Sequence, residues 1–239
     1  MQSILRAEAE ARGLALSEAQ LAQFETYTAE LVEWNSRFNL TRITDYDAVQ
    51  VQHFLDSLAV LIGAGDAFPN GARVVDVGTG AGLPGLALKI ARPDLRVTLA
   101  DSVGKKVQFL AHMIERLGLT DTVAVHARAE ELGRDRAHRA AYDVAVARAV
   151  ADLAVLAEYL LPLVRIGGTA IAQKGAHGEE EVARAEKAIR TLGGGLPRLT
   201  VYRLPGLDDP RSLVLIPKTR PTPPAYPRRP GLPSQSPLT

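Results

Sequence analysis

A cluster of glycines between a short apolar run and a helix restricts the fold of this chain more than any other feature. Arg73–Val77 is rich in β-branched residues, which predicts a strand, and the sequence Gly-Thr-Gly-Ala-Gly-Leu-Pro-Gly follows at 78–85. Pro84 suits the first turn of the next helix, because its missing N–H would be unpaired there. A glycine loop between a strand and a helix is where doubly wound α/β sheets bind a ligand. Glycine lets that ligand approach the main chain, so Gly78 and Gly80 are candidate contacts.

The chain after the loop alternates between strands and helices. The first helix ends near Pro93, and we expect further helices at 107–117 and 153–163 and a polar helix at 179–192. Between them we expect strands at 96–100, 123–126, 142–147 and 169–173. This alternation predicts a doubly wound, mostly parallel sheet. Two late strands, 198–204 and 212–216, are too close for a crossover helix, so we expect them to form an antiparallel hairpin and complete a seven-stranded sheet.

The first seventy residues predict helices. Ser17 and Gln20 have the spacing of a capping box, and an apolar series at helical spacing follows them: Phe24, Tyr27, Leu31 and Trp34. We expect this helix to break across 35–39, and a second apolar helix to run from Val51 to Gly63. We therefore expect residues 1–70 to form a helical cap on a sheet domain of residues 71–218.

The composition changes near the end of the chain. Residues 217–239 contain 8 of the 15 prolines and four basic residues, but no acidic residue. Because such a segment can bury little, we expect residues 219–239 to be a disordered tail. Without residues 217–239, 24 basic residues face 27 acidic ones. Any nucleic-acid binding must therefore come from a local patch.

Several classes of protein are excluded. The chain has no cysteine, which rules out disulfides, thiolate zinc sites, iron–sulfur clusters and a cysteine nucleophile. Its five histidines are scattered, so we expect no metal site. No stretch reaches the ~20 apolar residues of a membrane helix, and Met1–Arg12 lacks the apolar centre of a secretory signal. We expect a cytoplasmic protein that does not bind a membrane.

The loop is compatible with two cofactors. Gly80–Gly85 matches Gly-x-Gly-x-x-Gly, which is typical of NAD binding, and Asp101 ends the next strand, where a carboxylate can accept both ribose hydroxyls. Three features favour S-adenosylmethionine. Asp76 can brace the loop or oppose a sulfonium, the segment 129–131 can contact an adenine edge, and the late hairpin replaces the second half of an NAD domain.

The motifs in hand resemble those of a known family. In the order typical of that family, the chain contains Asn39-Leu-Thr41, His53-Phe-Leu-Asp-Ser57, the run 75–85, Asp101-Ser102, Gly104-Lys-Lys106, Arg148-Ala149 and Lys174-Gly175. The family is that of the bacterial 16S ribosomal RNA guanine-N7 methyltransferases, also called glucose-inhibited division protein B. The resemblance covers about residues 17–218 and leaves out the proline-rich tail.

The resemblance implies a class I S-adenosylmethionine methyltransferase with a Rossmann-like sheet and a helical N-terminal cap. The implied reaction is methylation of the guanine at position 527 of 16S ribosomal RNA, in the small ribosomal subunit. By similarity, Gly78, Leu83, Ala129, Glu130 and Arg148 contact the cofactor, and Asp101 matches the ribose carboxylate of the wider class.

The sequence lacks the motifs that other RNA base methylations require, which is consistent with methylation of guanine N7. Methylation of a pyrimidine C5 needs a cysteine, and methylation of an exocyclic amine uses an Asn/Asp-Pro-Pro-aromatic motif, which is not found after the fourth strand. Guanine N7 carries a lone pair and no proton. The enzyme can therefore act by alignment and charge accommodation, without a catalytic acid–base pair.

Three residues are candidates to hold the substrate. Arg148, at the end of the fourth strand, can read guanine O6, stack on the base or bind a phosphate, or it can simply pair with Glu130 or Asp152. Lys174, at the end of the fifth strand, can supply a point charge to the RNA backbone. His53 is either a buried structural histidine or a support for the substrate pocket. Further basic residues could form an RNA-facing patch: Arg37, Arg42, Lys105, Lys106 and Arg116.

Two alternatives remain open. An NAD-dependent oxidoreductase would need a catalytic Tyr-x-x-x-Lys or histidine, and Tyr142, Tyr159 and Tyr202 lack that spacing. A non-catalytic RNA-binding or ribosome-assembly module would have no use for the glycine loop and Asp101. We expect a monomeric methyltransferase.

Overall fold

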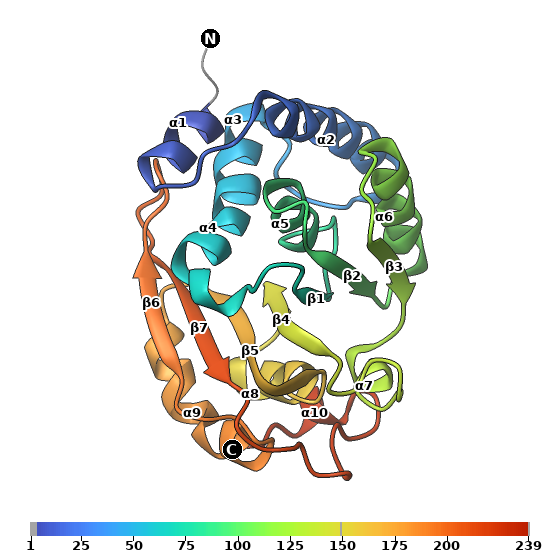
Figure 1. Ribbon diagram of the computed structural model, residues 1–239, viewed down its shortest axis with the longest axis vertical. Helices are drawn as coiled ribbons and strands as arrows, with labels where there is room; N and C mark the ends of the chain where they lie inside the picture. The colour runs from blue at the N-terminus through green and yellow to red at the C-terminus, as the bar shows by residue number, and fades with distance from the viewer. Residues whose placement is uncertain (1–3, 149, 239) are drawn as a thin grey trace.

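A seven-stranded sheet forms the centre of the protein, whose computed structural model describes residues 4–148 and 150–238 (Figure 1). The strand order is β3-β2-β1-β4-β5-β7-β6. The strands are β1 (Arg73–Val77), β2 (Arg96–Asp101), β3 (Thr122–His126), β4 (Tyr142–Arg148), β5 (Val164–Lys174), β6 (Arg198–Tyr202) and β7 (Arg211–Pro217). The first five pair in parallel, and β7 lies antiparallel between β5 and β6. The predicted mostly parallel sheet and late hairpin are confirmed.

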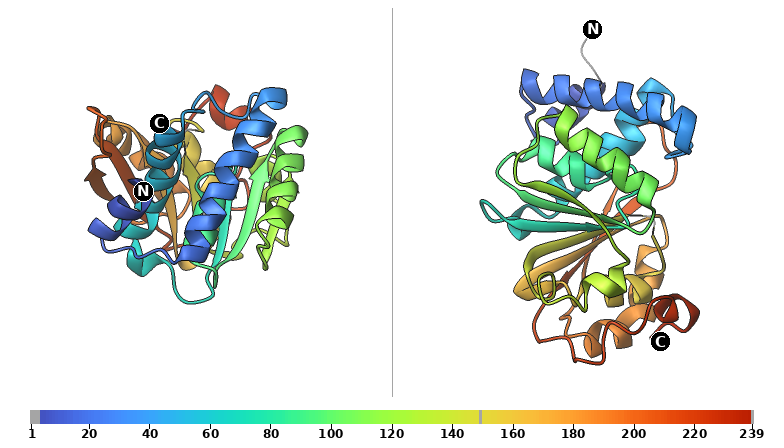
Figure 2. Two further views of the ribbon diagram at one scale, coloured as in Figure 1. Left: turned by 90° about the horizontal axis from the view of Figure 1, so that it is seen from above. Right: turned by 90° about the vertical axis from the view of Figure 1, so that its right-hand side faces the viewer.

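Helices cover both faces of the sheet (Figure 2). One face carries α1 (Ile4–Ala11), α2 (Glu18–Phe38), α3 (Tyr46–Ala48), a π-helix (Val49–Leu55), α4 (Asp56–Gly63), a short 3₁₀-helix (Gly65–Ala67), α5 (Gly85–Ala91) and α6 (Gly104–Arg116). The other face carries α7 (Ala129–Leu132), α8 (Leu153–Leu160), α9 (Gly178–Thr191) and α10 (Leu232–Gln235).

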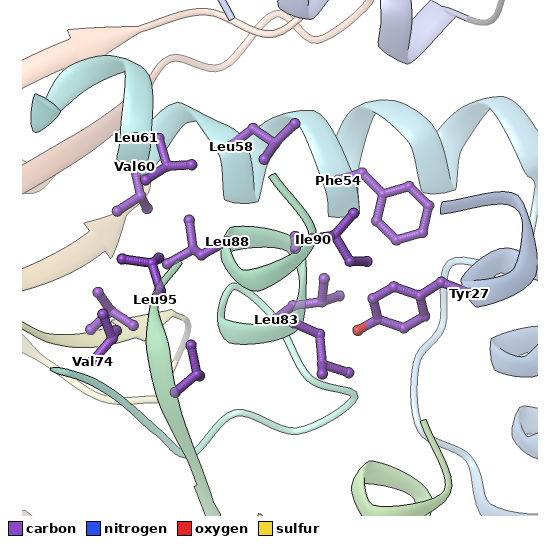
Figure 3. Close-up of a cluster of buried hydrophobic side chains, with 14 of the residues drawn as sticks. Tyr27, Phe54, Leu58, Val60, Leu61, Val74, Leu83, Leu88, Ile90 and Leu95 are labelled. Carbon is purple, nitrogen blue, oxygen red and sulfur yellow. The ribbon is translucent and has the colours of Figure 1, made fainter. Parts of the chain in front are cut away.

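The N-terminal helices share one hydrophobic cluster with the sheet. Tyr27 of α2 and Phe54 of the π-helix, both buried, have ring centroids 5.1 Å apart and belong to the same cluster as Val74 of β1. Figure 3 shows Leu83 and Ile90 beside these two rings. The helical region is therefore fixed against the glycine loop by apolar burial, the main favourable term in folding.

Helix α2 starts where the sequence predicted and ends later. Ser17 and Gln20 form the capping box, with N···O distances of 2.8 and 3.3 Å. The predicted break across 35–39 is wrong. The helix continues to Phe38 and ends at Asn39, which adopts the left-handed conformation (φ 50°) that asparagine tolerates.

The second predicted helix contains an irregular turn. The π-helix at Val49–Leu55 joins α3 to α4 without interruption. A π segment holds an extra residue per turn, and such segments are frequent at functional sites. His53, within this segment, and Asp56, directly after it, both line one cavity, described below.

The proline-rich tail is ordered, which corrects the expectation of disorder. Pro227 is buried, and Arg139 of the sheet domain donates hydrogen bonds to the carbonyls of Thr222 (2.9 Å) and Tyr226 (2.8 Å). A proline has no N–H to satisfy, so a proline-rich segment mainly needs donors for its carbonyls, and Arg139 supplies two of them here. The segment is short of apolar residues, but it packs on a surface that supplies the missing donors.

Candidate active site

The glycine loop leaves β1 at the carboxyl edge of the sheet. The N–H groups of Gly78 and Thr79 both donate to the carbonyl of Ala100 in β2, at 2.8 and 3.2 Å. Gly78, Gly80 and Gly82 have φ values of 69°, 61° and 94°. Only glycine adopts this region without strain, so the loop conformation accounts for the sequence motif.

The buried carboxylate of Asp76 holds the glycine loop through hydrogen bonds. Its Oδ2 accepts hydrogen bonds from Thr79 Oγ1 (2.5 Å) and from the Gly85 N–H (2.7 Å), and the residue is fully buried. Within the described residues, Oδ1 is buried without a hydrogen-bond partner. Burial raises the pKa of Asp76 to about 6, because it disfavours the charged form. Of the two roles considered for this carboxylate, the geometry shows the bracing one.

Asp101 ends β2 and holds the tip of the loop. Its Oδ2 accepts the Gly80 N–H and its Oδ1 accepts the Val103 N–H, both at 2.9 Å. Lys106 Nζ lies 3.8 Å from Oδ2, so the positive charge of Lys106 faces this carboxylate. A carboxylate has about four lone-pair positions, so Asp101 retains acceptors for two ribose hydroxyls.

A smaller cavity of about 150 Å³ lies where β1, β2 and β3 end. It is lined by Val77, Gly78, Ser102, Ala127, Arg128, Ala129, Glu130, Val150 and Tyr159. Three of the predicted cofactor contacts, Gly78, Ala129 and Glu130, therefore meet here. The carboxylate of Glu130 is buried and accepts the Gly231 N–H at 2.8 Å, a partner that the sequence did not suggest.

The other four predicted cofactor residues do not line this cavity: Gly80, Leu83, Asp101 and Arg148. Gly80 and Asp101 are joined by the hydrogen bond described above. The Leu83 side chain is buried in the hydrophobic cluster beside Tyr27, on the far side of the loop (Figure 3). Arg148 lies with the predicted substrate residues instead.

S-adenosylmethionine fits the residues at the smaller cavity. An added Cβ on Gly78 would come within 2.7 Å of Val150 Cγ2, so only glycine fits between the loop and Val150, which also lines this cavity. Small side chains at Ser102, Ala127 and Ala129 leave room for a flat base. Asp101 stands at the end of β2, in the position that the ribose carboxylate requires.

A larger cavity of about 530 Å³ lies where β4 and β5 end. It is lined by Thr41, Arg42, Ile43, Gln52, His53, Asp56, Arg148, Gln173, Lys174, Gly175, Glu181, Tyr202 and Arg211. The three predicted substrate residues, His53, Arg148 and Lys174, all line it. The larger and smaller cavities lie on either side of the boundary between β1 and β4, where the strand order reverses and α/β sheets bind their ligands.

Arg148 is bound by the N-terminal helical region. Its NH1 lies 2.9 Å from Asp56 Oδ2 and donates to the carbonyls of Gln52 (3.2 Å) and His53 (3.4 Å) in the π-helix. The alternative of an ion pair with Glu130 or Asp152 is wrong, because the Arg148 guanidinium pairs with Asp56, at the start of α4, instead.

Lys174 is also paired. Its Nζ lies 2.8 Å from Glu181 of α9 and donates to the Ala151 carbonyl at 2.6 Å. The ammonium group therefore lines the larger cavity as one half of an ion pair and not as an isolated charge for RNA.

His53 is buried and neutral. Its Nε2 lies 2.9 Å from Thr41 Oγ1, and its Nδ1 lies 3.3 Å from the Gln52 carbonyl. Burial, followed by the positive charge of Arg148, lowers the pKa of His53 to about 4. At neutral pH the ring therefore carries no charge.

Sequence reasoning missed several residues of the larger cavity, among them Gln173, Tyr202 and Arg211. The Tyr202 hydroxyl donates to Asp56 Oδ1 at 2.7 Å, and the Gln173 amide donates to the Asp56 carbonyl, also at 2.7 Å. Arg211 has a buried Nε without a partner among the described residues. Their positions in the predicted strands could have indicated them. Gln173 and Tyr202 stand at or near the carboxyl ends of β5 and β6, and Arg211 begins the antiparallel β7 at the same edge of the sheet.

The predicted RNA-facing patch is largely neutralised. Arg37 pairs with Glu33 at 3.1 Å, Arg116 pairs with Glu30 at 2.8 Å, and Lys106 faces Asp101. Arg42 alone among the five lines the larger cavity. Across residues 4–148 and 150–238, no cluster of side chains suited to a metal ion is present. In the same ranges, no helix is long and apolar enough to cross a membrane.

The strand order, the glycine loop after β1 and the acid at the end of β2 define an S-adenosylmethionine-dependent methyltransferase with a Rossmann-like sheet. Solved structures agree on the fold. A single-residue mutant of the 16S rRNA (adenine(1408)-N(1))-methyltransferase from Catenulisporales acidiphilia has a TM-score of 0.54 at 15% identity, over 67% of this chain and 91% of that one. A SAM-dependent O-methyltransferase from Thermotoga maritima has a TM-score of 0.54 at 14% identity, over 81% and 73%.

Sequence comparisons identify the family. The family model described as GidB, rRNA small subunit methyltransferase G, matches residues 20–203. A ribosomal RNA small subunit methyltransferase G from Roseiflexus sp. (strain RS-1) is 51% identical over 96% of this chain and 97% of its own. The protein of the same name from Halalkalibacterium halodurans is 47% identical over 98% of both chains. The chain belongs to the rRNA small subunit methyltransferase G family.

Proposed function

We propose that this chain, an S-adenosylmethionine-dependent methyltransferase of 16S ribosomal RNA, transfers the methyl group to N7 of a guanine held in the larger cavity. One observation carries the choice of N7: the acids and the histidine that line this cavity are already engaged. Asp56 binds Arg148 and Tyr202, Glu181 binds Lys174, and His53 contacts Thr41 and the Gln52 carbonyl. The resemblance of the sequence motifs implies the guanine at position 527.

Guanine N7 suits such a site because it requires no base. Its lone pair is available and no proton leaves it during the reaction, whereas an exocyclic amine must lose a proton. S-adenosylmethionine supplies an electrophilic methyl group. The protein has to align that group with N7 and exclude water, and alignment alone can contribute ~7–11 kcal/mol to lowering the barrier. Asp56 and Glu181 can then accommodate the positive charge that the purine gains.

In this proposal the smaller cavity binds the cofactor and the larger cavity binds the RNA base. On the smaller side, Gly78, Gly80, Asp101, Ala129 and Glu130 would hold the cofactor, with Asp101 on the ribose. Leu83 lies in the core and would support the loop rather than touch the ligand through its side chain.

On the larger side, Arg148 would face the base, and His53 and Lys174 would shape the wall around it. Arg42 and Arg211 would bind RNA phosphates at the rim, because an arginine fork matches phosphate oxygens.

The test is product analysis. The protein is incubated with S-adenosylmethionine and either small subunits that lack the modification or naked 16S RNA, and the RNA is digested to nucleosides. We expect 7-methylguanosine at a single position. A methyl group on an exocyclic amine, or no 7-methylguanosine from either substrate, would contradict the proposal. Thermal shift with S-adenosylmethionine and NAD tests the cofactor, and stabilisation by NAD alone would favour an oxidoreductase.

We also infer that the protein acts as a monomer in the cytoplasm, where its ribosomal substrate is found. A single chain supplies the residues that line both cavities. Light scattering should give a mass near 25.6 kDa. A stable dimer would contradict this part of the proposal.

A further inference from the structure

The C-terminal tail ends against the walls of the smaller cavity. The Gly231 N–H donates to Glu130 Oε1 at 2.8 Å, and Ser234 Oγ lies 2.9 Å from the Tyr159 hydroxyl. Both Glu130 and Tyr159 line that cavity and both are buried. The segment to which the sequence assigned no role thus reaches two residues of the cofactor side.

A buried ion pair fixes the tail in this position. Arg228 donates four hydrogen bonds to Glu158 of α8, at 2.7 to 3.1 Å, through its main-chain N–H and its guanidinium. Glu158 is fully buried, so removal of the Arg228 guanidinium would leave a buried carboxylate with the main-chain N–H of residue 228 but without its compensating charge. Glu158 directly precedes Tyr159, so the ion pair holds the turn of α8 that carries the cavity wall.

The tail also packs on the other wall, α7. Pro227 lies so close to Gly133 that a Cβ added there would come within 2.8 Å of Pro227 Cγ. Arg134, the next residue, donates to the Pro227 carbonyl at 2.8 Å. The tail therefore ties α7 and α8 together behind the smaller cavity.

We propose that Arg228, Gly231 and Ser234 are positioning residues for the cofactor: the tail segment 226–235 holds Glu130 and Tyr159 in place and thereby sets the affinity for S-adenosylmethionine. The family model ends at residue 203, so this segment lies outside the matched region. The inference rests on the assignment of the smaller cavity to the cofactor. It predicts that changes in the tail act on cofactor binding and leave the RNA side intact.

The experiment measures cofactor binding to the full-length protein by calorimetry, without RNA. Ser234→Ala removes one contact to the cavity wall, and we expect the Kd for S-adenosylmethionine to rise about fivefold, as for one lost hydrogen bond. Arg228→Ala should weaken binding further, and Arg228→Lys should restore part of it. Arg229→Ala is the matched control, because Arg229 is the exposed neighbour of Arg228 on the same tail.

Steady-state kinetics separate positioning from a loss of stability. For Ser234→Ala we expect a higher KM for S-adenosylmethionine, with an unchanged kcat and an unchanged KM for RNA. Wild-type Kd values in both Ser234→Ala and Arg228→Ala would overturn the inference, as would an equal fall of all kinetic constants with the melting temperature. If the wild-type protein itself fails to bind S-adenosylmethionine, the cofactor assignment is what fails.

Discussion

Tyr202 donates a 2.7 Å hydrogen bond to Asp56, which joins the last residue of β6 to the first turn of α4. The second oxygen of the same carboxylate accepts Arg148 from β4. Burial and the negative charge of Asp56 raise the pKa of Tyr202, so the hydroxyl stays protonated and remains a donor. Arg148, which we propose faces the substrate, is thus held by Asp56, and Asp56 is itself held by Tyr202 of the edge strand β6.

Removal of that hydroxyl should loosen Arg148. For Tyr202→Phe we expect kcat/KM for RNA methylation to fall about fivefold to tenfold, because one net hydrogen bond is worth ~1 kcal/mol. Cofactor affinity should not change. Val201→Ala, which truncates the exposed neighbour on the same strand, serves as the control. Equal activity of Tyr202→Phe and wild type would show that Asp56 needs no second donor.

Breaking the ion pair itself should cost more. The Arg148 and Asp56 side chains are 15% and 9% exposed, so the ion pair is largely buried. Arg148→Ala leaves the Asp56 carboxylate with Tyr202 as its remaining side-chain donor. Loss of one member of a buried pair costs ~3–5 kcal/mol, and partial exposure places this pair near the lower end. We expect urea unfolding to show a loss of about 3 kcal/mol. The double variant Asp56→Asn/Arg148→Ala should lose less than the sum of its single variants; strict additivity would contradict the coupling.

Asp101 should control cofactor binding through both the ribose and the loop. Asp101→Ala removes the acceptor of the Gly80 N–H and also the carboxylate that we propose binds the ribose. Charged hydrogen bonds are worth ~1.5–3 kcal/mol each, so the Kd for S-adenosylmethionine should rise about tenfold to a hundredfold. Asp101→Asn keeps one acceptor oxygen and should lose less. An unchanged Kd in Asp101→Ala, measured by calorimetry, would show that the ribose lies elsewhere.

His53 should make stability depend on pH. Its folded pKa of about 4 is below the value of 6.5 expected in the unfolded chain, so between these values the unfolded state binds more protons. Stability is therefore full above pH 6.5 and falls as the pH drops toward 4, by an amount on the order of 3 kcal/mol.

The measurement compares wild type with His53→Gln by urea unfolding from pH 4 to 7. The wild-type protein should lose stability relative to the variant as the pH falls. Asp76, whose raised pKa acts in the opposite direction, is present in both proteins and cancels. His177→Gln, which alters an exposed histidine, serves as the control for the substitution itself. A constant difference across the range would mean that His53 titrates normally.

Local patterns explain which parts of the structure could be predicted. The glycine loop, the strand alternation and the capping box at Ser17 depend on neighbouring residues, and the sequence displays them directly. The partner of Arg148 could not be found in this way, because Asp56 is 92 positions away and reaches it only after the helical region packs on the sheet. The ordered tail was missed for the same reason, since Arg139 and Glu158 supply from a distance what the tail lacks in apolar surface.

The irregular turn at Val49–Leu55 has a consequence for variation in this family. One residue of insertion converts a regular helix into a π segment, and one residue of deletion restores it. A deletion here would rotate every following side chain by ~100° about the helix axis. Asp56 would then turn away from Arg148 while much of α4, which is apolar over most of its surface, could still find buried contacts. Deletion of a single residue here would thus break the contact between Asp56 and Arg148 while the protein could still fold. Related chains should therefore conserve the length of this segment more strictly than its composition.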